Sequence, residues 1–214
     1  MNDRSFNNDG KIMPDSKATT NRDKATSKRR NQILEAAVMC FLEKGYHQTG
    51  VRDIAARAGI SLGNLYNHFP GKHDVLVEIA QLERKEVGPF LEMLMKPSPA
   101  PKVLDGFIGA YAKYLSAPEN VILSLEITSE AIRQPDIARL FLDTRENLIA
   151  TLVTLVERGI AEGDFRSVPN ANQVSHLIIE ILESSAERSV FSNTPMRKIV
   201  GSVRDFVSAA LQPQ

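Results

Sequence analysis

Residues 50–72, GVRDIAARAGISLGNLYNHFPGK, constrain the fold more than any other part of the chain. The first half of this stretch carries apolar residues at helical spacing and breaks at Gly59. The second half is a short helical segment over 61–68, which stops before Pro70. Because two helices joined by a glycine turn form a common DNA-binding unit, the stretch predicts a helix-turn-helix.

The second of these helices carries unusual surface residues. A merely solvated helix face usually holds Lys and Glu pairs, whereas this one offers Ser61, Asn64, Tyr66, Asn67 and His68. Hydroxyl, amide and imidazole groups bond readily to phosphates and base edges. Gly63 costs about 1 kcal/mol against alanine in a helix interior, so we interpret it as a position where the backbone approaches a ligand closely.

The net charge of zero conceals two oppositely charged halves. Residues 1–72 hold 12 Lys or Arg against 7 Asp or Glu, a net charge of +5. Residues 73–214 hold 14 against 19, a net charge of −5. Positive charge gathered on the part with the helix-turn-helix suits a polyanion, and we expect double-stranded DNA as the partner.

A polar tail precedes the first helix. Residues 1–27 are rich in Asn, Asp, Lys, Ser and Thr without an apolar repeat, and we expect a disordered arm there. Arg29 and Arg30 add positive charge that can follow a phosphate backbone or enter a minor groove. A solubilising leader is the alternative interpretation of the first twenty residues. Apolar spacing then predicts a helix over 27–44 that stops at Gly45.

Residues at the helix starts set the local chemistry. Gly50 is an acceptable N-cap, and Asp53 puts a negative charge in the first turn, where the helix dipole favours it. Arg52 lies on the outer side of the same helix, and Ser61 caps the next one. Lys72 begins the following helix, where its ammonium and the free N–H groups can share a phosphate oxygen.

Several motifs together resemble a known family. They are Ile33-Leu34-Glu35-Ala36-Ala37, Gly45-Tyr46, Ile54-Ala55, Ala58-Gly59-Ile60-Ser61, Leu65-Tyr66, His68-Phe69 and Lys72. Over residues 28–76 the chain resembles the DNA-binding domain of the TetR family of bacterial transcriptional regulators. The resemblance implies that Tyr66 and Lys72 contact phosphates. The residues that it places on DNA are Arg52, Ser61, Leu62, Asn64, Tyr66, Asn67, His68 and Lys72, to which we add Gly63 from its close backbone approach.

The chain departs from the family pattern at two positions. Gly50 stands where the family often has a Thr or Ser whose hydroxyl contacts a phosphate. Leu62 replaces a frequent Lys or Arg, and we expect it to read a thymine methyl instead. Asn64 is our candidate for direct readout, because an amide pairs bidentately with adenine.

Long amphipathic segments fill the rest of the chain. They predict helices over 74–95, from 103 to before Pro118, and over 119–134, 135–160, 170–191 and 195–211, with Pro89 as a possible kink. The fold class is therefore all-α with about nine helices. We expect a disordered arm over 1–27, a DNA-binding domain over 28–73 and a domain for effector binding and dimerisation over 74–214. GIAEGDFR (159–166) and segment 126–139 loosely resemble family members of the choline-responsive BetI type.

One recognition helix offers too few contacts for tight operator binding, so we expect a homodimer on a palindromic operator. The resemblance implies a four-helix interface built from segments 170–191 and 195–211. The candidate interface residues are Ile178, Ile181, Leu182, Ser185, Val203 and Phe206.

An effector pocket is expected among the body helices. Its candidate residues are Phe107, Tyr111, Tyr114, Leu123, Glu126, Glu130, Phe141, Arg145, His176 and Glu180. Glu126 and Glu130 share one helix face, which indicates either a cationic effector or a partner such as Arg133. The aromatic residues and His176 have an alternative role in the core.

The sequence argues against an enzyme. It contains no Gly-rich phosphate loop, no His-Glu-x-x-His and no Gly-x-Ser-x-Gly, so we expect no catalytic residues, no metal and no cofactor. Cys40 is the only cysteine, which excludes an intramolecular disulfide. No apolar run approaches the roughly 18 residues that cross a bilayer. We therefore expect a cytoplasmic protein that does not bind membranes.

The sequence thus predicts a dimeric repressor that a small-molecule effector releases from a palindromic operator. The alternative is a helical small-molecule carrier whose helix-turn-helix contacts protein. An activator of the same family is a further possibility that the sequence does not separate from a repressor.

Overall fold

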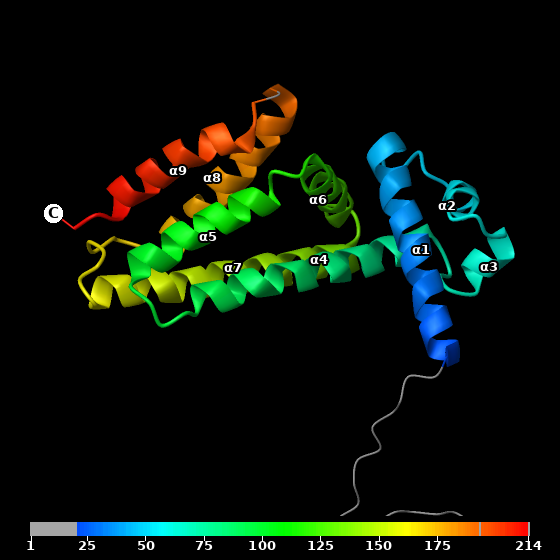
Figure 1. Ribbon diagram of the computed structural model, residues 1–214, viewed down its shortest axis with the longest axis horizontal. Helices are drawn as coiled ribbons and strands as arrows, with labels where there is room; N and C mark the ends of the chain where they lie inside the picture. The colour runs from blue at the N-terminus through cyan, green and yellow to red at the C-terminus, as the bar shows by residue number, and fades with distance from the viewer. Residues whose placement is uncertain (1–20, 193, 214) are drawn as a thin grey trace, which may run out of the picture.

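The computed structural model describes residues 21–192 and 194–213, which form nine α-helices and no strand (Figure 1). Their bounds are α1 Asn21–Lys44, α2 Val51–Arg57, α3 Leu62–Tyr66, α4 Lys72–Leu94, α5 Ala100–Tyr114, α6 Pro118–Ala131, α7 Pro135–Ala161, α8 Ala171–Ser192 and α9 Met196–Leu211. The prediction of an all-α fold with about nine helices is confirmed.

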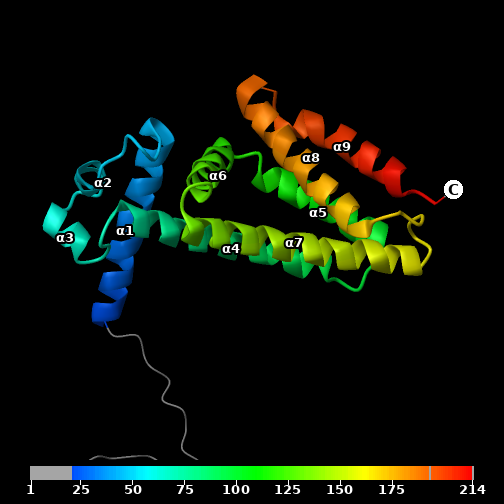
Figure 2. The same ribbon diagram turned by 180° about the vertical axis from the view of Figure 1, so that it is seen from behind.

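The helices fall into two groups. Helices α1–α3 lie at one end of the molecule, and α4 leads from them into a bundle in which it runs beside α7 (Figures 1 and 2). Helices α5 and α8 pack on this pair, and α9 packs on α5 and α8. We call α1–α3 with the first turns of α4 the head, and the remaining helices the body. Helix α6 lies in the body at the side of the head.

Glycines and short-range caps shape the head. Gly45 and Gly59 have φ values of 77° and 64°, a region that side chains rarely adopt, and each ends a helix or its turn. Gly50 caps α2, and its N–H donates to Oδ2 of Asp53 at 2.8 Å. The Ser61 hydroxyl accepts from the Asn64 N–H at 3.2 Å, so the predicted caps of α2 and α3 are present.

Two apolar clusters hold the molecule together. One packs α1, α2 and α3 against the first turns of α4, and it also takes in Ile127 of α6 and Ile137 of α7. The other fills the body, from Val87 of α4 to Leu211 at the end of α9. Because both body isoleucines are fully buried in the head's cluster, the head rests directly on α6 and α7 as well as on α4.

The structure differs from the predicted boundaries in detail. Helix α1 begins at Asn21, so residues 21–27 are helical rather than part of a disordered arm, and the first twenty residues lie outside the described part. Helix α4 continues through Pro89 to Leu94. No helix in the described part is long and apolar enough to cross a membrane.

Candidate nucleic-acid interface and effector cavity

Helix α3 presents a polar face because its apolar residues point inward. Leu65 and Phe69 are buried in the head, whereas the Tyr66 side chain is 48% exposed. The predicted readers follow the same division: Ser61, Gly63 and Asn67 are exposed, and Leu62, Asn64 and His68 are half-buried. One short helix therefore offers hydroxyl, amide and imidazole groups on a single outer surface.

The side-chain oxygen of Asn64 points into the protein rather than toward solvent. This oxygen, Oδ1, is buried and has no hydrogen-bond partner within residues 21–192 and 194–213. A bidentate pair with adenine needs both the oxygen and the nitrogen of the amide. The predicted base contact would therefore require the side chain to turn outward, which would also give the unpaired oxygen a partner.

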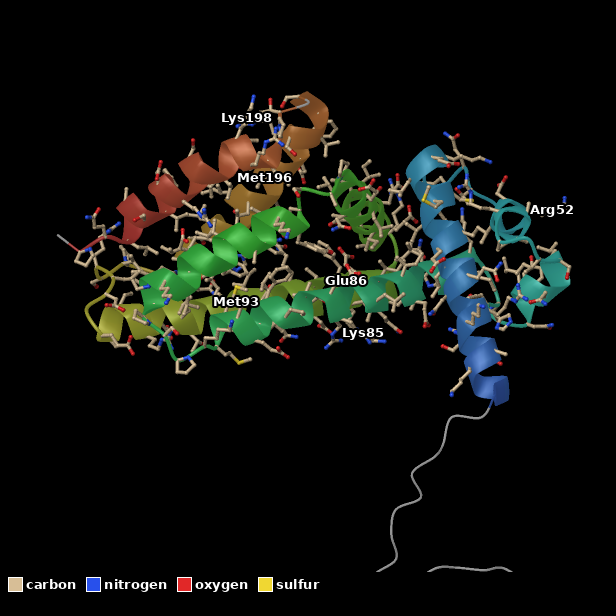
Figure 3. The ribbon with its side chains drawn as sticks, in the orientation of Figure 1. Arg52, Lys85, Glu86, Met93, Met196 and Lys198 are labelled. Atoms are coloured by element: carbon tan, nitrogen blue, oxygen red, sulfur yellow. The ribbon has the colours of Figure 1, made fainter. Side chains whose placement is uncertain are left out.

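Two predicted cations are accessible. Arg52 is exposed on α2, and Figure 3 shows it at the edge of the head that lies away from the body. Arg29 donates one guanidinium nitrogen to Gln32 at 2.8 Å on the same helix, which leaves other N–H groups for a phosphate. Both suit the backbone contacts that fix a protein's register on DNA.

Arg30 contacts other residues of the head. Its guanidinium donates to the His68 carbonyl at 2.8 Å and to Glu78 at 2.9 Å, and it lies 4.3 Å from the centroid of the Phe69 ring. These contacts tie α1 to the end of α3 and to α4. Two N–H groups of Arg30 are therefore engaged inside the head, and the predicted DNA contact would have to use the others.

Lys72 is also engaged inside the head. Its ammonium donates to the Tyr46 carbonyl at 2.6 Å and lies 4.1 Å above the Tyr46 ring. Burial lowers the pKa of Lys72, with Glu130 partly offsetting it. A phosphate contact by Lys72 would have to compete with these bonds. Tyr66 is therefore a stronger candidate than Lys72 for a phosphate contact.

An internal cavity lies among α4, α5, α6, α7 and α8 and encloses about 60 Å³. Of the predicted pocket residues, Tyr111, Phe141 and Arg145 line it. Arg145 pairs with Glu183, and the Tyr111 hydroxyl donates to the same carboxylate at 3.3 Å. Burial, with the Glu183 charge as a second cause, raises the pKa of Tyr111. The cavity wall therefore combines an aromatic surface with a charged cluster.

Glu126 and Glu130 do not line this cavity, and both contact the head instead. Glu126 accepts from the Tyr46 N–H at 2.9 Å. Glu130 is buried, lies 2.7 Å from Nε2 of His47 and accepts from Gln134 at 2.6 Å. Both carboxylates thus hold the turn between α1 and α2, and neither needs a cationic effector or Arg133 as a partner.

The other predicted pocket residues lie elsewhere. Phe107 is fully buried in the body's core. Tyr114 and Leu123 line a separate groove beside α1. Glu180 is exposed and lies 3.9 Å from Arg145, whereas His176 is half-buried on α8 and lines none of the described cavities.

Sequence reasoning missed several residues of the cavity wall. They are Glu83 and Arg84 of α4, Ser124 of α6, Thr144 of α7 and Glu183 of α8. Glu83 had a detectable signal, because it stands four residues from both Ile79 and Val87 on the apolar stripe of α4. A carboxylate on an apolar helix face indicates either an ion pair or a binding site.

The predicted dimer residues also need correction. Ile178, Leu182 and Val203 are buried in the body's own core, so their side chains cannot meet a second copy. Ile181 and Ser185 are half-buried, and Phe206 of α9 is 62% exposed. The outward face of α8 carries Leu177 and Phe191, which are 46% and 78% exposed.

Comparison with known sequences places the head in an established class. Residues 33–79 match the family model described as "Bacterial regulatory proteins, tetR family". The chain is 28% identical over 150 residues to the HTH-type transcriptional repressor KstR2 of Rhodococcus jostii strain RHA1. That match covers 66% of this chain and 70% of the repressor, so it extends well beyond the head.

Solved structures share the whole fold. One is a transcriptional regulator from Saccharomonospora viridis in complex with choline, with a TM-score of 0.78, 21% identity and coverage of 88% of this chain and 100% of that one. Another is the regulator FadR from Bacillus subtilis in complex with stearoyl-CoA, with a TM-score of 0.70, 21% identity and coverage of 83% and 96%. At these identities the likeness establishes the fold.

Proposed function

The chain belongs to the TetR family of bacterial transcriptional regulators, and from this premise we propose that it is a repressor that binds a palindromic operator as a dimer and leaves it when a small molecule binds. Its relatives are DNA-binding regulators rather than enzymes. We further propose that residues 28–73 bind DNA and that residues 74–214 bind the effector and form the dimer.

The polar face of α3 supports the DNA-binding half of this proposal. Tyr66 has an exposed hydroxyl for a phosphate, and Asn64 and Leu62 are the candidates for base readout. Arg52 and Arg29 supply accessible positive charge on the neighbouring helices. Since only a few side chains reach the bases, a second copy is needed for operator affinity.

Exposed apolar residues support dimerisation through α8 and α9. Leu177, Ser184 and Phe191 lie on the outward face of α8, and Phe206 lies outward on α9. A large aromatic ring that is 78% exposed, as at Phe191, gains by burial against another apolar surface. A two-fold interface would place the same residues opposite each other in both copies.

The single observation that carries the regulatory half is the position of α6 between cavity and head. Ser124 and Ile127 of this helix line the internal cavity. On the same helix, Glu126 and Glu130 bind the turn that leads into the helix-turn-helix. A ligand that moves α6 while filling the cavity would therefore move the head, provided that it binds the two arrangements with different affinity.

Selection from random DNA duplexes tests this function. The full chain should enrich an inverted repeat, and the enriched duplex should bind more weakly as salt rises, linearly in log units. Recovery of no sequence, or of a sequence without two-fold symmetry, would contradict the proposal.

A further inference from the structure

A second groove, which shares Glu83 with the internal cavity, lies between the head and the body. It encloses about 500 Å³ and is formed by α1, α4, the end of α5 and α6. Its apolar lining includes Leu34 of α1, Ile79 and Leu82 of α4, and Leu123 of α6. The groove is therefore large enough for a small organic ligand, and it is shared by both parts of the molecule.

The groove has charge of only one sign. The carboxylates Glu35, Glu83 and Glu86 line it, and no Lys or Arg does so in the part of the chain that the structure describes. In Figure 3, Glu86 lies on the side of α4 that faces α5 and α6, whereas Lys85 lies on the opposite side. These carboxylates would repel an anion and attract a cation.

Glu83 is the carboxylate of this groove that is partly buried without a bonding partner. It is half-buried and has neither a hydrogen bond nor an ion pair within residues 21–192 and 194–213. Burial raises the pKa of Glu83 to about 7, and repulsion from Glu86 and Glu183 adds to this effect. A bound cation would supply the partner that the fold does not.

Apolar and aromatic surface accompanies the carboxylates. Met39 of α1 is 45% exposed and Leu82 of α4 is 38% exposed, and they come from opposite sides of the groove. Tyr114 adds an aromatic ring beside Glu83 and Glu86. Burial raises the pKa of Tyr114, and the charges of Glu83 and Glu86 add to this effect. An aromatic ring next to carboxylates attracts an organic ammonium more than it attracts a hydrated metal ion.

We propose that this groove is a second ligand site, which binds an amphipathic organic cation. The ammonium lies near Glu83, Glu86 and Tyr114, and the apolar part covers Leu82 and Met39. Because its walls come from α1 as well as from α4 and α6, the ligand contacts the head and the body together. The site does not depend on the proposed repressor function, since the binding can be measured without DNA.

Calorimetric titration of the full chain with octyltrimethylammonium tests the site directly. We expect one bound cation per chain, and much weaker binding of octyl sulfate and of octanol, which share the tail. Glu83→Gln should weaken binding about fivefold or more, because one charge-assisted contact is lost. The matched control is Glu92→Gln, an exposed carboxylate on α4 outside the groove, which should bind as the parent does.

A second pair of variants separates the groove from the internal cavity. Met39→Lys puts a positive charge into the groove from an exposed position and should reduce the affinity about tenfold or more. Met95→Lys, at the 64% exposed end of α4, is its control. If Thr144→Leu in the cavity abolishes binding while Met39→Lys leaves it intact, the cation occupies the cavity and the proposal is wrong.

Proton release gives an independent readout. The titratable and charged residues that line the same two hollows as Glu83 are Arg84 and Glu86 of α4, Glu35 of α1, Tyr111 and Tyr114 of α5, Arg145 of α7 and Glu183 of α8. A cation bound beside Glu83 favours the ionised form, so binding near neutral pH should release protons, seen as different heats in buffers of different ionisation enthalpy. Glu83→Gln should remove this difference.

Three outcomes overturn the proposal: octyl sulfate binding as tightly as the ammonium, no effect of Met39→Lys, or no saturable binding of the ammonium. DNA binding of the same preparations keeps the two proposals apart. If the protein binds the duplex but not the ammonium, only the groove proposal is contradicted. If it binds the ammonium but not the duplex, only the repressor proposal is contradicted.

Discussion

The buried carboxylate of Glu130 on α6 lies 2.7 Å from Nε2 of His47, in the turn that joins α1 to α2. Four residues earlier on the same helix, Glu126 accepts the Tyr46 N–H. The body therefore holds the entrance of the helix-turn-helix by two side chains of α6, in addition to the continuous backbone of α4.

Glu126→Ala should loosen this turn. The Tyr46 N–H loses its acceptor, so its hydrogen exchange should become about tenfold faster, which corresponds to about 1.4 kcal/mol of local opening. Glu119→Ala, at the exposed start of α6, should leave that amide unchanged. Equal exchange rates of Tyr46 in the parent and in Glu126→Ala would show that α6 does not hold the turn.

Tyr66→Phe and Asn64→Ala should affect DNA binding in different ways. Loss of the exposed Tyr66 hydroxyl should weaken all duplexes alike, because a phosphate contact carries no sequence information. Loss of the Asn64 amide should cost about 1–3 kcal/mol on the selected duplex and little on others. Competition binding with single-base variants measures both effects, and an Asn64→Ala variant with unchanged discrimination would remove Asn64 from base readout.

We expect substitutions of Arg30 and Arg52 to have different effects. Arg30→Ala should lower the free energy of unfolding by about 1–3 kcal/mol, because the His68 carbonyl and Glu78 lose their donor. Arg52→Ala should leave stability unchanged and flatten the salt dependence of DNA binding by about 0.9 in the log–log slope. Thermal unfolding and salt titrations measure these effects. A loss of stability in Arg52→Ala, with only a smaller salt slope in Arg30→Ala, would contradict the prediction.

Glu83 should make stability depend on pH. Its pKa in the folded chain is about 7, above the ordinary value of 4.5, because burial disfavours the charged form. Between these two pKa values the folded state holds a proton that the unfolded state releases. The loss of folding stability caused by ionising Glu83 is therefore absent below pH 4.5 and fully present above about pH 7. Glu83→Gln should raise Tm more at about pH 8 than at about pH 5, whereas Glu92→Gln should shift neither. A Tm change that is equal at both pH values would contradict the raised pKa.

The positions of the helices could be predicted because their signals are local. Apolar spacing at three and four residues marks each helix, and Gly45, Gly59 and Pro135 mark ends or starts that the structure reproduces within a few residues. The caps Gly50 and Ser61 were predictable for the same reason, since their partners stand three residues away. The start of α1 was missed because residues 21–27 are polar and carry no apolar stripe.

Contacts between distant helices could not be predicted in the same way. Glu126 meets Tyr46 across 80 residues, and Arg30 meets His68 across 38. Periodicity places Glu126 and Glu130 on one face of α6 but does not say whether that face meets a ligand or the head. On α8 the same periodicity assigns Ile178, Leu182 and Leu177 to one apolar stripe. In the structure Ile178 and Leu182 are buried in the core, whereas Leu177 is exposed to solvent.

The number of chains bound to one duplex tests whether the protein binds a palindromic operator as a dimer. Native mass spectrometry and binding isotherms should be recorded with the selected duplex and with a duplex in which one half-site is scrambled. We expect two chains on the intact duplex, with a large loss of affinity when either half-site is scrambled. One chain bound equally well to both duplexes would contradict a dimeric reader of a palindrome.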